Sequence, residues 1–392
     1  MEASHPRAKL KYKSLGSRAA IRLVVIRPGS GDEPIRCHLI HTKLGEMAYE
    51  ALSYEWKEES NDDPTINVSG ENVTVRKNLH DALVRIRLPE TGLHIWIDAL
   101  SIDQSDTLER NAQIKIMGQI YSGALRVIVW LGNAAENSDT ALRMLKEIAT
   151  HATLRRTDGT NSDEHSNQLI KLFNGFDHEE WKALVALCQR PYWSRIWVLQ
   201  EIHLAKSYKV HCGKESIGDS DFHDSIAIFH YDKMKTENTT EYFQIIIESA
   251  VSAHRLAKNL PSHFHTLRRW ISATSSGGFV STNPHDMIYA LLGVSSDWQD
   301  GRVLLMPNYN KPLPDLFFDV VRIIMARPLG KHSIKTLNWL AECFECTTDP
   351  KVKKFFTDLK PVPKSYMAQL QDLMLRFKFK ARRSLNLKPI GQ

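Results

Sequence analysis

Polar and aromatic side chains gather at three points where a short apolar run of the chain ends. These points are Ser53–Trp56, Asp98–Gln104 and Trp130–Gly132. In open α/β sheets, ligands bind beyond the carboxyl ends of the strands, where loops and helix N-termini converge. We therefore predict that the three points meet on one rim of a sheet and bind a ligand there. The predicted ligand-binding residues are Tyr54, Trp56, Asp98, Asp103, Gln104, Trp130 and Gly132.

A structural role is the alternative for each of these residues taken alone. Asp98 and Asp103 are of a type that caps helices. Trp56, Trp96 and Trp130 are large apolar residues suited to a core. The combination favours binding, because a purely structural turn needs only Gly, Pro or Asn.

Strand and helix signals alternate through the first half of the chain. Asn78 is predicted to cap one helix, and Asp106 to cap a second that extends from Thr107 to Ser122, with Glu109 completing a capping box. Such alternation indicates βαβ units, and therefore an α/β fold with a mostly parallel sheet flanked by helices. The predicted strands are Ile21–Ile26, Ala51–Trp56, His94–Ala99, Arg126–Leu131 and Tyr208–Cys212.

Three further segments show clear patterns. Residues Thr65–Val75 alternate around Ser69-Gly70, which predicts a β-hairpin. Residues Thr153–Asn167 are polar and are predicted to form a surface loop. Two helices are expected after this loop, at Glu179–Cys188 and Ser194–Ala205.

Positive charge is concentrated near the C-terminus. The net charge is +6, but residues 351–392 alone hold eleven Lys and Arg against two Asp, so the rest of the chain is slightly negative. We expect a basic segment at 1–20, an α/β core at 21–215, a mostly helical extension at 216–345 and a basic tail at 346–392. Such a tail is usually a solvated segment, with contact to membranes or nucleic acid as the alternative.

Composition bounds the compartment and the chemistry. Five sparse cysteines do not form a disulfide framework, and no secretory signal or long apolar run is present, so we expect a cytoplasmic protein. Cys343 and Cys346 form a lone Cys-x-x-Cys pair without the second pair that a zinc ribbon needs. No phosphate-loop signature occurs either. We therefore expect no metal and no resident cofactor.

The same segments resemble the heterokaryon-incompatibility (HET) domain of filamentous fungi. AYEALSYEW is similar to the family's opening motif and RKNLHDAL to its next helix, while IWIDALSIDQSDTLERNAQIKIMGQIYSGALRVIVWLG follows its central block. PYWSRIWVLQEIHLA, VHCG and NPHDMIYALLGV follow in the expected order, within Ala48–Val294. Two positions depart from the family pattern. Lys57 stands where Gly is common, and Ser101-Ile102-Asp103-Gln104 replaces Cys-Ile-Asn-Gln.

This resemblance implies a role in self/non-self recognition and regulated cell death, triggered by self-association or by an incompatibility partner protein. HET domains have been regarded as remote relatives of the Toll/interleukin-1 receptor (TIR) fold, which implies a flavodoxin-like core. Some TIR domains cleave NAD, with one glutamate on a helix that follows a tryptophan. Trp197 and Glu201 resemble that arrangement, so Glu201 is the implied catalytic residue, Trp197 a ligand-binding residue and NAD the implied substrate.

The chemistry of Glu201 is physically reasonable. Glycosidic cleavage passes through an oxocarbenium-like state, which a nearby carboxylate can stabilise. Residues four apart on a helix share a face, and apolar neighbours would raise the pKa of the glutamate. The alternative is a surface glutamate paired with Arg195 or a lysine. Arg110 is a further predicted ligand-binding residue, suited to bind phosphate or to pair with Asp98 or Asp103. Secondary candidates are Glu109, Gln113 and Asp286.

Three functions are consistent with the sequence. The first is an allorecognition effector that kills the cell, with or without NAD cleavage. The second is a non-catalytic interaction scaffold, in which the same rim binds protein and the basic tail contacts a membrane or another acidic partner. The third, which the sequence favours least, is a nucleic-acid-associated regulator that uses the basic tail.

Overall fold

The computed structural model describes residues 10–17, 19–157, 162–229, 239–251, 265–275, 277–302, 305–325 and 331–359. The chain divides into two compact units, Met1–Asn310 and Lys311–Gln392. Half of the predicted basic N-terminal segment and most of the predicted basic tail lie outside the described residues.

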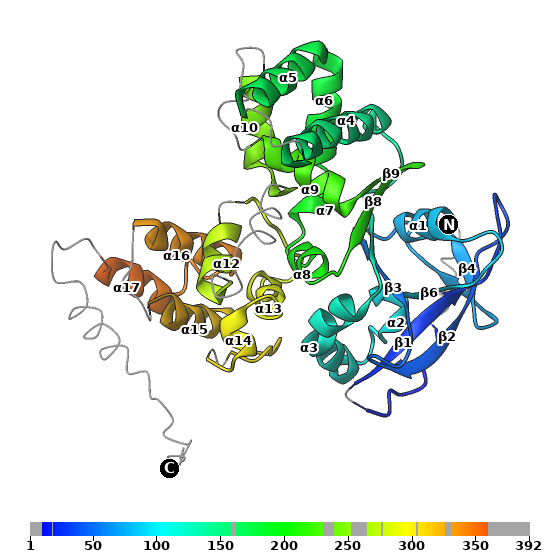
Figure 1. The fold of residues 1–392 in the computed structure, drawn as a ribbon. Helices are drawn as coiled ribbons and strands as arrows, with labels where there is room; N and C mark the ends of the chain where they lie inside the picture. The colour runs from blue at the N-terminus through cyan, green and yellow to red at the C-terminus, as the bar shows by residue number, and fades with distance from the viewer. Residues whose placement is uncertain are drawn as a thin grey trace, which may run out of the picture. The chain divides into compact units, whose positions relative to one another are not determined.

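The first unit is built on one nine-stranded sheet with the order β5-β4-β2-β1-β6-β3-β7-β8-β9 (Figure 1). Every strand predicted from the sequence is present, with ends that differ by a few residues. The strands are β1 (Ala20–Ile26), β2 (Arg36–Lys43), β3 (Glu50–Tyr54), β4 (Thr65–Val68), β5 (Glu71–Thr74), β6 (Leu93–Trp96), β7 (Val127–Trp130), β8 (Tyr208–Cys212) and β9 (Glu215–Gly218).

The α/β class is confirmed, but the sheet is mixed where the sequence pattern predicted mostly parallel pairing. Parallel pairs join β6, β3, β7 and β8 in its centre, and also β2 with β4. The other pairs, β1 with β2 and β6, β4 with β5, and β8 with β9, are antiparallel. The reason lies in the connections, because β1–β2, β4–β5 and β8–β9 are joined by links too short for a crossover helix.

The β4–β5 hairpin forms as predicted. Its turn places Ser69 and Gly70 at φ 54° and 93°, both in the left-handed region. Two consecutive positive φ angles match the twist of the flanking strands, which is the condition for a two-residue hairpin loop.

Helices cover both faces of the sheet centre. Helix α1 (Lys77–Ile86) buries Leu79 and Leu83 against a face that includes Leu52 and Ile128. Helix α3 (Thr107–Gly123) lies on the opposite face, where the Tyr121 ring meets Trp96 edge-on at 5.5 Å. The short helix α2 (Asp98–Ser101) follows β6. Strand alternation therefore sends successive side chains of β3 into two different layers.

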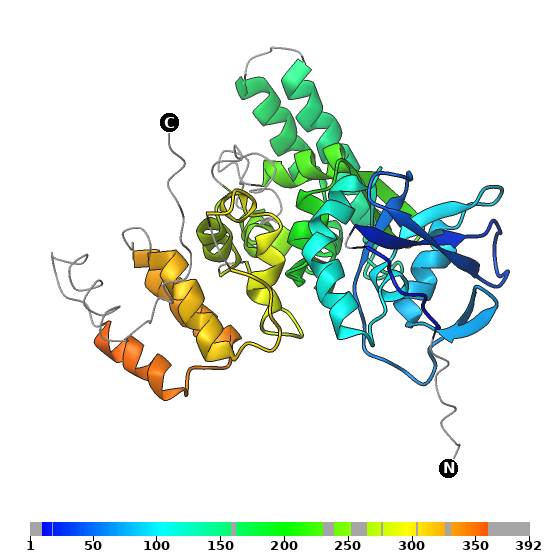
Figure 2. The same ribbon diagram turned by 90° about the horizontal axis from the view of Figure 1, so that it is seen from below.

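A helical group adjoins β8 and β9 (Figures 1 and 2). Its aromatic core contains Phe173, Trp181, Phe229 and Phe243. The loop predicted at Thr153–Asn167 is wrong for the part that the structure describes, because residues 153–157 and 162–167 are helical. Buried Leu145, Ile148 and Leu169 anchor these helices, and the polar stretch forms their ends. The group comprises α4 (Ser138–Thr157), α5 (Ser162–Gly175), α6 (His178–Cys188), α9 (Asp219–Ile228) and α10 (Thr240–Glu248).

Beyond β9 the described elements are helices. The first unit continues with α12 (Leu267–Thr274), α13 (Asp286–Leu292) and α14 (Ser296–Gln299). The second unit holds α15 (Leu313–Met325), α16 (Lys331–Cys343) and α17 (Pro350–Asp358), with the Phe317 and Phe355 rings in contact. Among the described helices we find none with the length and apolar character to cross a bilayer.

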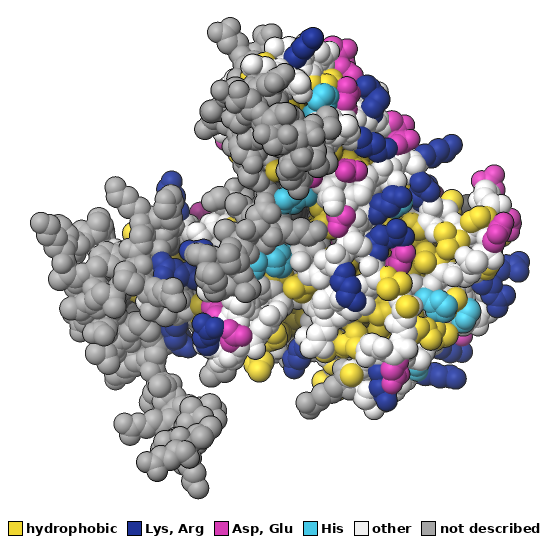
Figure 3. Space-filling model, viewed as in Figure 1, with side chains coloured by type: hydrophobic (Ala, Val, Ile, Leu, Met, Phe, Trp, Pro, Cys, Tyr) yellow, Lys and Arg dark blue, Asp and Glu magenta, His cyan; other side chains and the backbone are white. Residues whose placement is uncertain are grey.

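The exposed surface is uneven in polarity. Figure 3 shows hydrophobic and histidine side chains gathered over the part of the molecule where β1, β2 and β6 lie in Figure 1. Most residues of β2 are partly exposed. This end of the sheet is therefore accessible from at least one side.

Glu109 does something other than complete a capping box. Asp106 caps α3 as predicted, accepting the Leu108 and Glu109 backbone N–H groups. The Glu109 carboxylate instead forms a two-pronged ion pair with the fully buried Arg22, at 2.5 and 2.8 Å, and accepts the Asp103 N–H at 2.7 Å. The pair ties β1 to the start of α3 and to the loop between β6 and α3.

The substitution Glu109→Gln should destabilise the protein by about 3 kcal/mol, because it leaves the buried Arg22 guanidinium without a counter-charge. Urea unfolding followed by circular dichroism measures this loss. Glu179→Gln removes an exposed pair with Lys182 and should change the unfolding midpoint little. Equal midpoints for the two variants would contradict the importance of the buried pair.

Candidate functional site

The chain breaks its helix just before Glu201. One helix was predicted over Ser194–Ala205, but α7 (Pro191–Ser194) ends before α8 (Val198–His203) begins. The residues between them form an isolated bridge with Val280, in which Ile196 N–H donates to Val280 O at 3.1 Å and Val280 N–H donates to Ser194 O at 2.7 Å. Arg195 is therefore extended, and its side chain reaches back to α8.

Glu201 is buried beneath the sheet centre. Its carboxylate is 1% exposed and accepts a hydrogen bond from the Ser53 hydroxyl. The Ser53 hydroxyl also lies 2.5 Å from the Tyr192 hydroxyl. Arg195 Nη2 lies 3.6 Å from the other carboxylate oxygen. Glu201 is thus held by the strand β3, the helix α7 and the break between the helices.

The electrostatics of this cluster are unbalanced. Burial raises the pKa of Glu201, while Arg195 and the Ser53 hydrogen bond lower it and Asp98 raises it further. Burial likewise raises the pKa of Asp98, against Arg195 and the Trp56 hydrogen bond. One guanidinium therefore serves two carboxyl groups. Its Nη1 has no hydrogen-bond partner in the described part of the chain.

The rim above this cluster is closed by Trp56. Its indole N–H donates to Asp98 Oδ1 at 3.1 Å, and the Arg76 guanidinium lies 5.0 Å from the ring centre. Trp56 is 37% exposed, so one edge of the cluster reaches the surface. Gln104 steadies the same loop by donating to the Asp98 carbonyl at 3.0 Å.

The sequence predicted that Asn78 caps α1. In the structure Asn78 does not cap this helix and is instead part of the rim. The N-cap is Arg76, and Asn78 is buried within the first turn. Its amide donates to Glu55 O at 2.8 Å and accepts the Trp130 indole N–H at 3.0 Å. A buried indole needs such a hydrogen-bond partner, so Asn78 binds Trp130 and α1 begins without a capping side chain.

The structure brings the predicted strand ends together, but the sheet separates their side chains. Tyr54 and Trp130 are buried in the core on the α1 side, whereas Ser53 and Glu201 lie on the α3 side. Gly132 follows β7 at φ 99°, a conformation that favours glycine. Asp103 accepts the Ser105 N–H and hydroxyl, and so stabilises a turn.

Other predicted residues lie elsewhere. Trp197 hydrogen-bonds to Asp286, which also accepts the Tyr309 hydroxyl at 2.6 Å. Trp197 and Glu201 therefore have different neighbours, although the helical spacing predicted one shared face. Gln113 donates to Ala20 O at 3.0 Å. Arg110 is partly buried on α3, and we find no ion pair for it among the described residues.

The sequence did not single out Ser53 or Tyr192 as partners of Glu201. It predicted a partly desolvated Glu201, with a surface pair to Arg195 as the alternative, and in the structure Glu201 pairs with Arg195 but is buried. Period-two alternation from the buried Tyr54 indicates that Ser53 faces the other layer, so that signal was available. Nothing local indicated Tyr192, whose role depends on how α7 packs against β3.

Comparison with known proteins gives the same region a family. Residues 49–201 match the model of the family "Heterokaryon incompatibility protein (HET)". The chain is 24% identical to heterokaryon incompatibility protein 6, OR allele, of Neurospora crassa, over 78% of this chain and 52% of that protein. The chain thus spans about half the length of this curated relative. No solved structure matches it, so the TIR-like core stays a prediction.

Asn78→Ala should cost about 2–3 kcal/mol in the free energy of unfolding, because it leaves the Trp130 indole N–H and the Glu55 carbonyl without partners. Chemical denaturation monitored by tryptophan fluorescence measures the change. Asn133→Ala removes an exposed hydrogen bond to Asp81 and should stay within about 0.5 kcal/mol of the parent. If Asn78→Ala lost less than about 0.5 kcal/mol in the free energy of unfolding, the bridging role of Asn78 would be refuted.

Glu201→Gln should gain stability relative to the parent as the pH rises above about 4.5, the ordinary pKa of the carboxyl. The folded parent holds its proton to higher pH than the unfolded chain does, so it loses stability as Glu201 ionises. Denaturation at a series of pH values tests this sign. Glu215 provides a control of opposite sign, because its hydrogen bond and ion pair with Lys146 lower its pKa. Parallel pH profiles for Glu201→Gln and the parent would disprove the raised pKa.

Proposed function

We propose that the protein acts in fungal self/non-self recognition and triggers regulated cell death, through a HET domain that includes residues 49–201. Two findings support this proposal. The family model covers the sheet centre and ends at Glu201. The Neurospora relative is named for heterokaryon incompatibility. Self-association or an incompatibility partner protein is the proposed trigger.

We propose further that the effector step is cleavage of NAD at the nicotinamide–ribose bond. The observation that carries this step is the buried cluster of Glu201, Ser53, Arg195 and Asp98 at the carboxyl end of the parallel strands. A buried carboxylate with incomplete charge compensation is costly for stability. Perturbed carboxyl groups beside a strand-end rim are typical of functional sites.

The residues of the cluster would have distinct roles. The Glu201 carboxylate would stabilise positive charge on the ribose as the glycosidic bond breaks. Ser53 and Tyr192 would hold that carboxylate in place through their hydroxyl groups. The unpartnered Nη1 of Arg195 would donate to an anionic or hydroxyl group of the substrate. Trp56 offers an exposed aromatic face at the entrance.

The closed state of the cluster constrains this mechanism. Glu201 is 1% exposed, so the substrate reaches it only after the rim moves. The Trp56–Asp98 hydrogen bond is exposed to solvent and would be the point of opening. Self-association would then act by opening the rim.

The same burial favours a second candidate function, a non-catalytic scaffold. In that case the cluster only joins β3 to α7 and α8, and the rim binds another protein. The two functions differ in whether Glu201 is required once the fold is intact.

The purified protein, at high concentration or artificially dimerised, should release nicotinamide from NAD, and Glu201→Gln should reduce the rate at least about 100-fold. Chromatographic detection of nicotinamide measures the rate. Glu50→Gln is the matched control, because Glu50 lies at the opposite end of β3 in an ion pair with Arg126 at 2.6 Å. That variant should keep the parental rate.

Expression of the same variants in a fungal host separates the two candidate functions. Loss of viability with the parent and Glu50→Gln, but not with Glu201→Gln, supports the enzyme. Intact NAD together with equal killing by a folded Glu201→Gln would refute the enzyme and favour the scaffold. Unchanged viability with every variant would contradict the effector role itself.

A further inference from the structure

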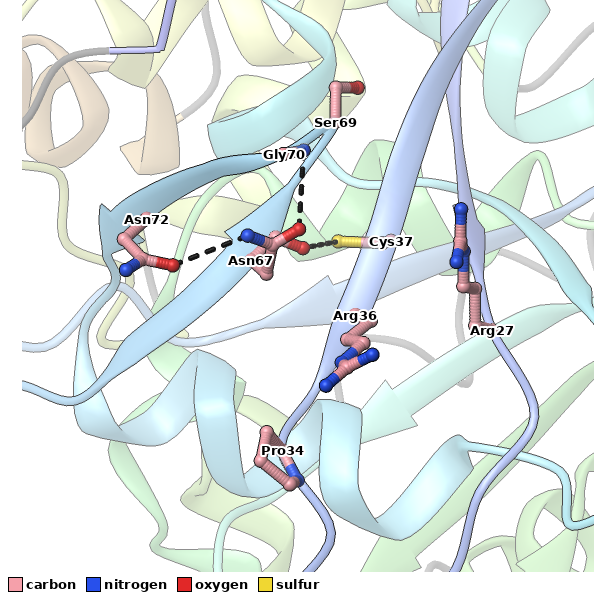
Figure 4. Close-up of a pocket in the computed structure, with 8 residues that line it drawn as sticks. All are labelled: Arg27, Pro34, Arg36, Cys37, Asn67, Ser69, Gly70 and Asn72. Carbon is pink, nitrogen blue, oxygen red and sulfur yellow. Dashed lines mark hydrogen bonds between the residues drawn. The ribbon is translucent and has the colours of Figure 1, made fainter.

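A second polar site lies at the other end of the sheet, away from the Glu201 cluster. It is a cavity of about 420 Å³, drawn in Figure 4. Its walls come from β2, the β4–β5 hairpin and the segment that joins β1 to β2. The lining residues are Arg27, Pro34, Arg36, Cys37, Asn67, Ser69, Gly70 and Asn72.

Strand register places the polar side chains in one row. Ile26 pairs with Cys37, so the next antiparallel pair is Arg27 opposite Arg36, and Arg27 N–H donates to Arg36 O at 2.8 Å. Arg36 pairs in turn with Asn67, and Asn67 with Asn72. Residues directly opposite each other project from the same face of a sheet. Two arginines and two asparagines therefore line up across β2, β4, β5 and the residue that directly follows β1.

The two arginines form an unfavourable pair. Like charges directly opposite each other on neighbouring strands destabilise a sheet. No carboxylate lines the cavity, and we find no ion pair for either guanidinium among the residues that the structure describes. Both side chains are exposed, so their charge is available to a ligand from solution.

The floor of the cavity is rigid and uncharged. Asn67 donates to Asn72 Oδ1 at 3.2 Å and accepts Gly70 N–H at 3.2 Å, as Figure 4 shows. The Cys37 thiol contacts Asn67 O, and burial raises the pKa of this thiol to about 12, so it stays neutral. The alternate residues of these strands, such as Val68 and Val73, are fixed in the core under α1.

We propose that this cavity is an anion site for a phosphate group carried by a small molecule or a lipid headgroup. Guanidinium groups bind phosphate oxygens through paired N–H donors, which makes two adjacent arginines well suited to this ligand. The Asn72 amide and the Ser69 hydroxyl add neutral donors at the edge of the cavity. Its volume accepts a phosphate with an attached group of modest size.

The site stands apart from the proposed NAD chemistry. Arg27 directly follows β1 and Arg36 begins β2, so both charged residues lie outside residues 49–201 of the family match, whereas the lining residues from Asn67 to Asn72 lie within it. The anion site can therefore exist whether or not the Glu201 cluster is catalytic.

Calorimetric titration of the full chain with pyrophosphate tests the proposal. We expect saturable binding that Arg27→Gln/Arg36→Gln weakens at least about 10-fold. Arg143→Gln/Arg302→Gln is the matched control, since it removes the same charge from two exposed arginines that pair with Glu180 and Asp300. This control should bind like the parent.

A second arm identifies the source of the phosphate. Vesicles of phosphatidylcholine with and without a phosphatidylinositol phosphate are sedimented with the same three proteins. Retention that needs both the phosphorylated lipid and the arginine pair supports a headgroup ligand, and binding to pyrophosphate alone supports a soluble one. Equal binding by the two double variants in both arms, or none by the parent in either, would overturn the proposal.

Discussion

The positive charge of Arg195 compensates the burial of two carboxyl groups, those of Glu201 and Asp98, at the centre of this molecule. It lies 3.6 Å from the Glu201 carboxylate and also lowers the pKa of Asp98. Without it, two carboxyl groups would be buried beneath the strand ends with only neutral hydrogen-bond partners, which costs several kcal/mol per charge. The break between α7 and α8 is held by backbone hydrogen bonds to Val280, and it turns the Arg195 side chain inward.

Close packing around α8 preserves that geometry. Gln200 lies between α3 and α13, where a Cβ atom on Gly293 would come within 1.6 Å of its Nε2 and one on Gly118 within 3.1 Å. Two glycines therefore allow the helix to sit deep enough for Glu201 to reach Ser53. Trp197 and Asp286 fix the start of the helix from the other side. The Glu201 cluster is therefore tightly packed and closed to solvent in this structure.

The centre and one edge of the sheet carry two different polar clusters. In the centre, parallel strands end beside the buried carboxyl groups. At the β4–β5 edge, antiparallel pairing and the hairpin leave a face open, and the row from Arg27 to Asn72 lies there. Both sites follow from alternation along strands, which sends neighbouring residues to opposite layers.

Features that depend on neighbouring residues could be predicted from the sequence. Apolar runs placed the strands, Ser69-Gly70 specified the hairpin, Asp106 capped its helix, and the ordered motifs indicated the HET family, whose model matches residues 49–201. Features that depend on distant residues could be seen only in the folded chain. Some of these features join segments that are far apart in the chain, namely the burial of Glu201 against Ser53 and the Arg22–Glu109 pair. Others join residues that face each other across strands, namely the antiparallel pairs and the Arg27–Arg36 row. Local spacing cannot specify such contacts, because they are selected by the packing of the whole sheet.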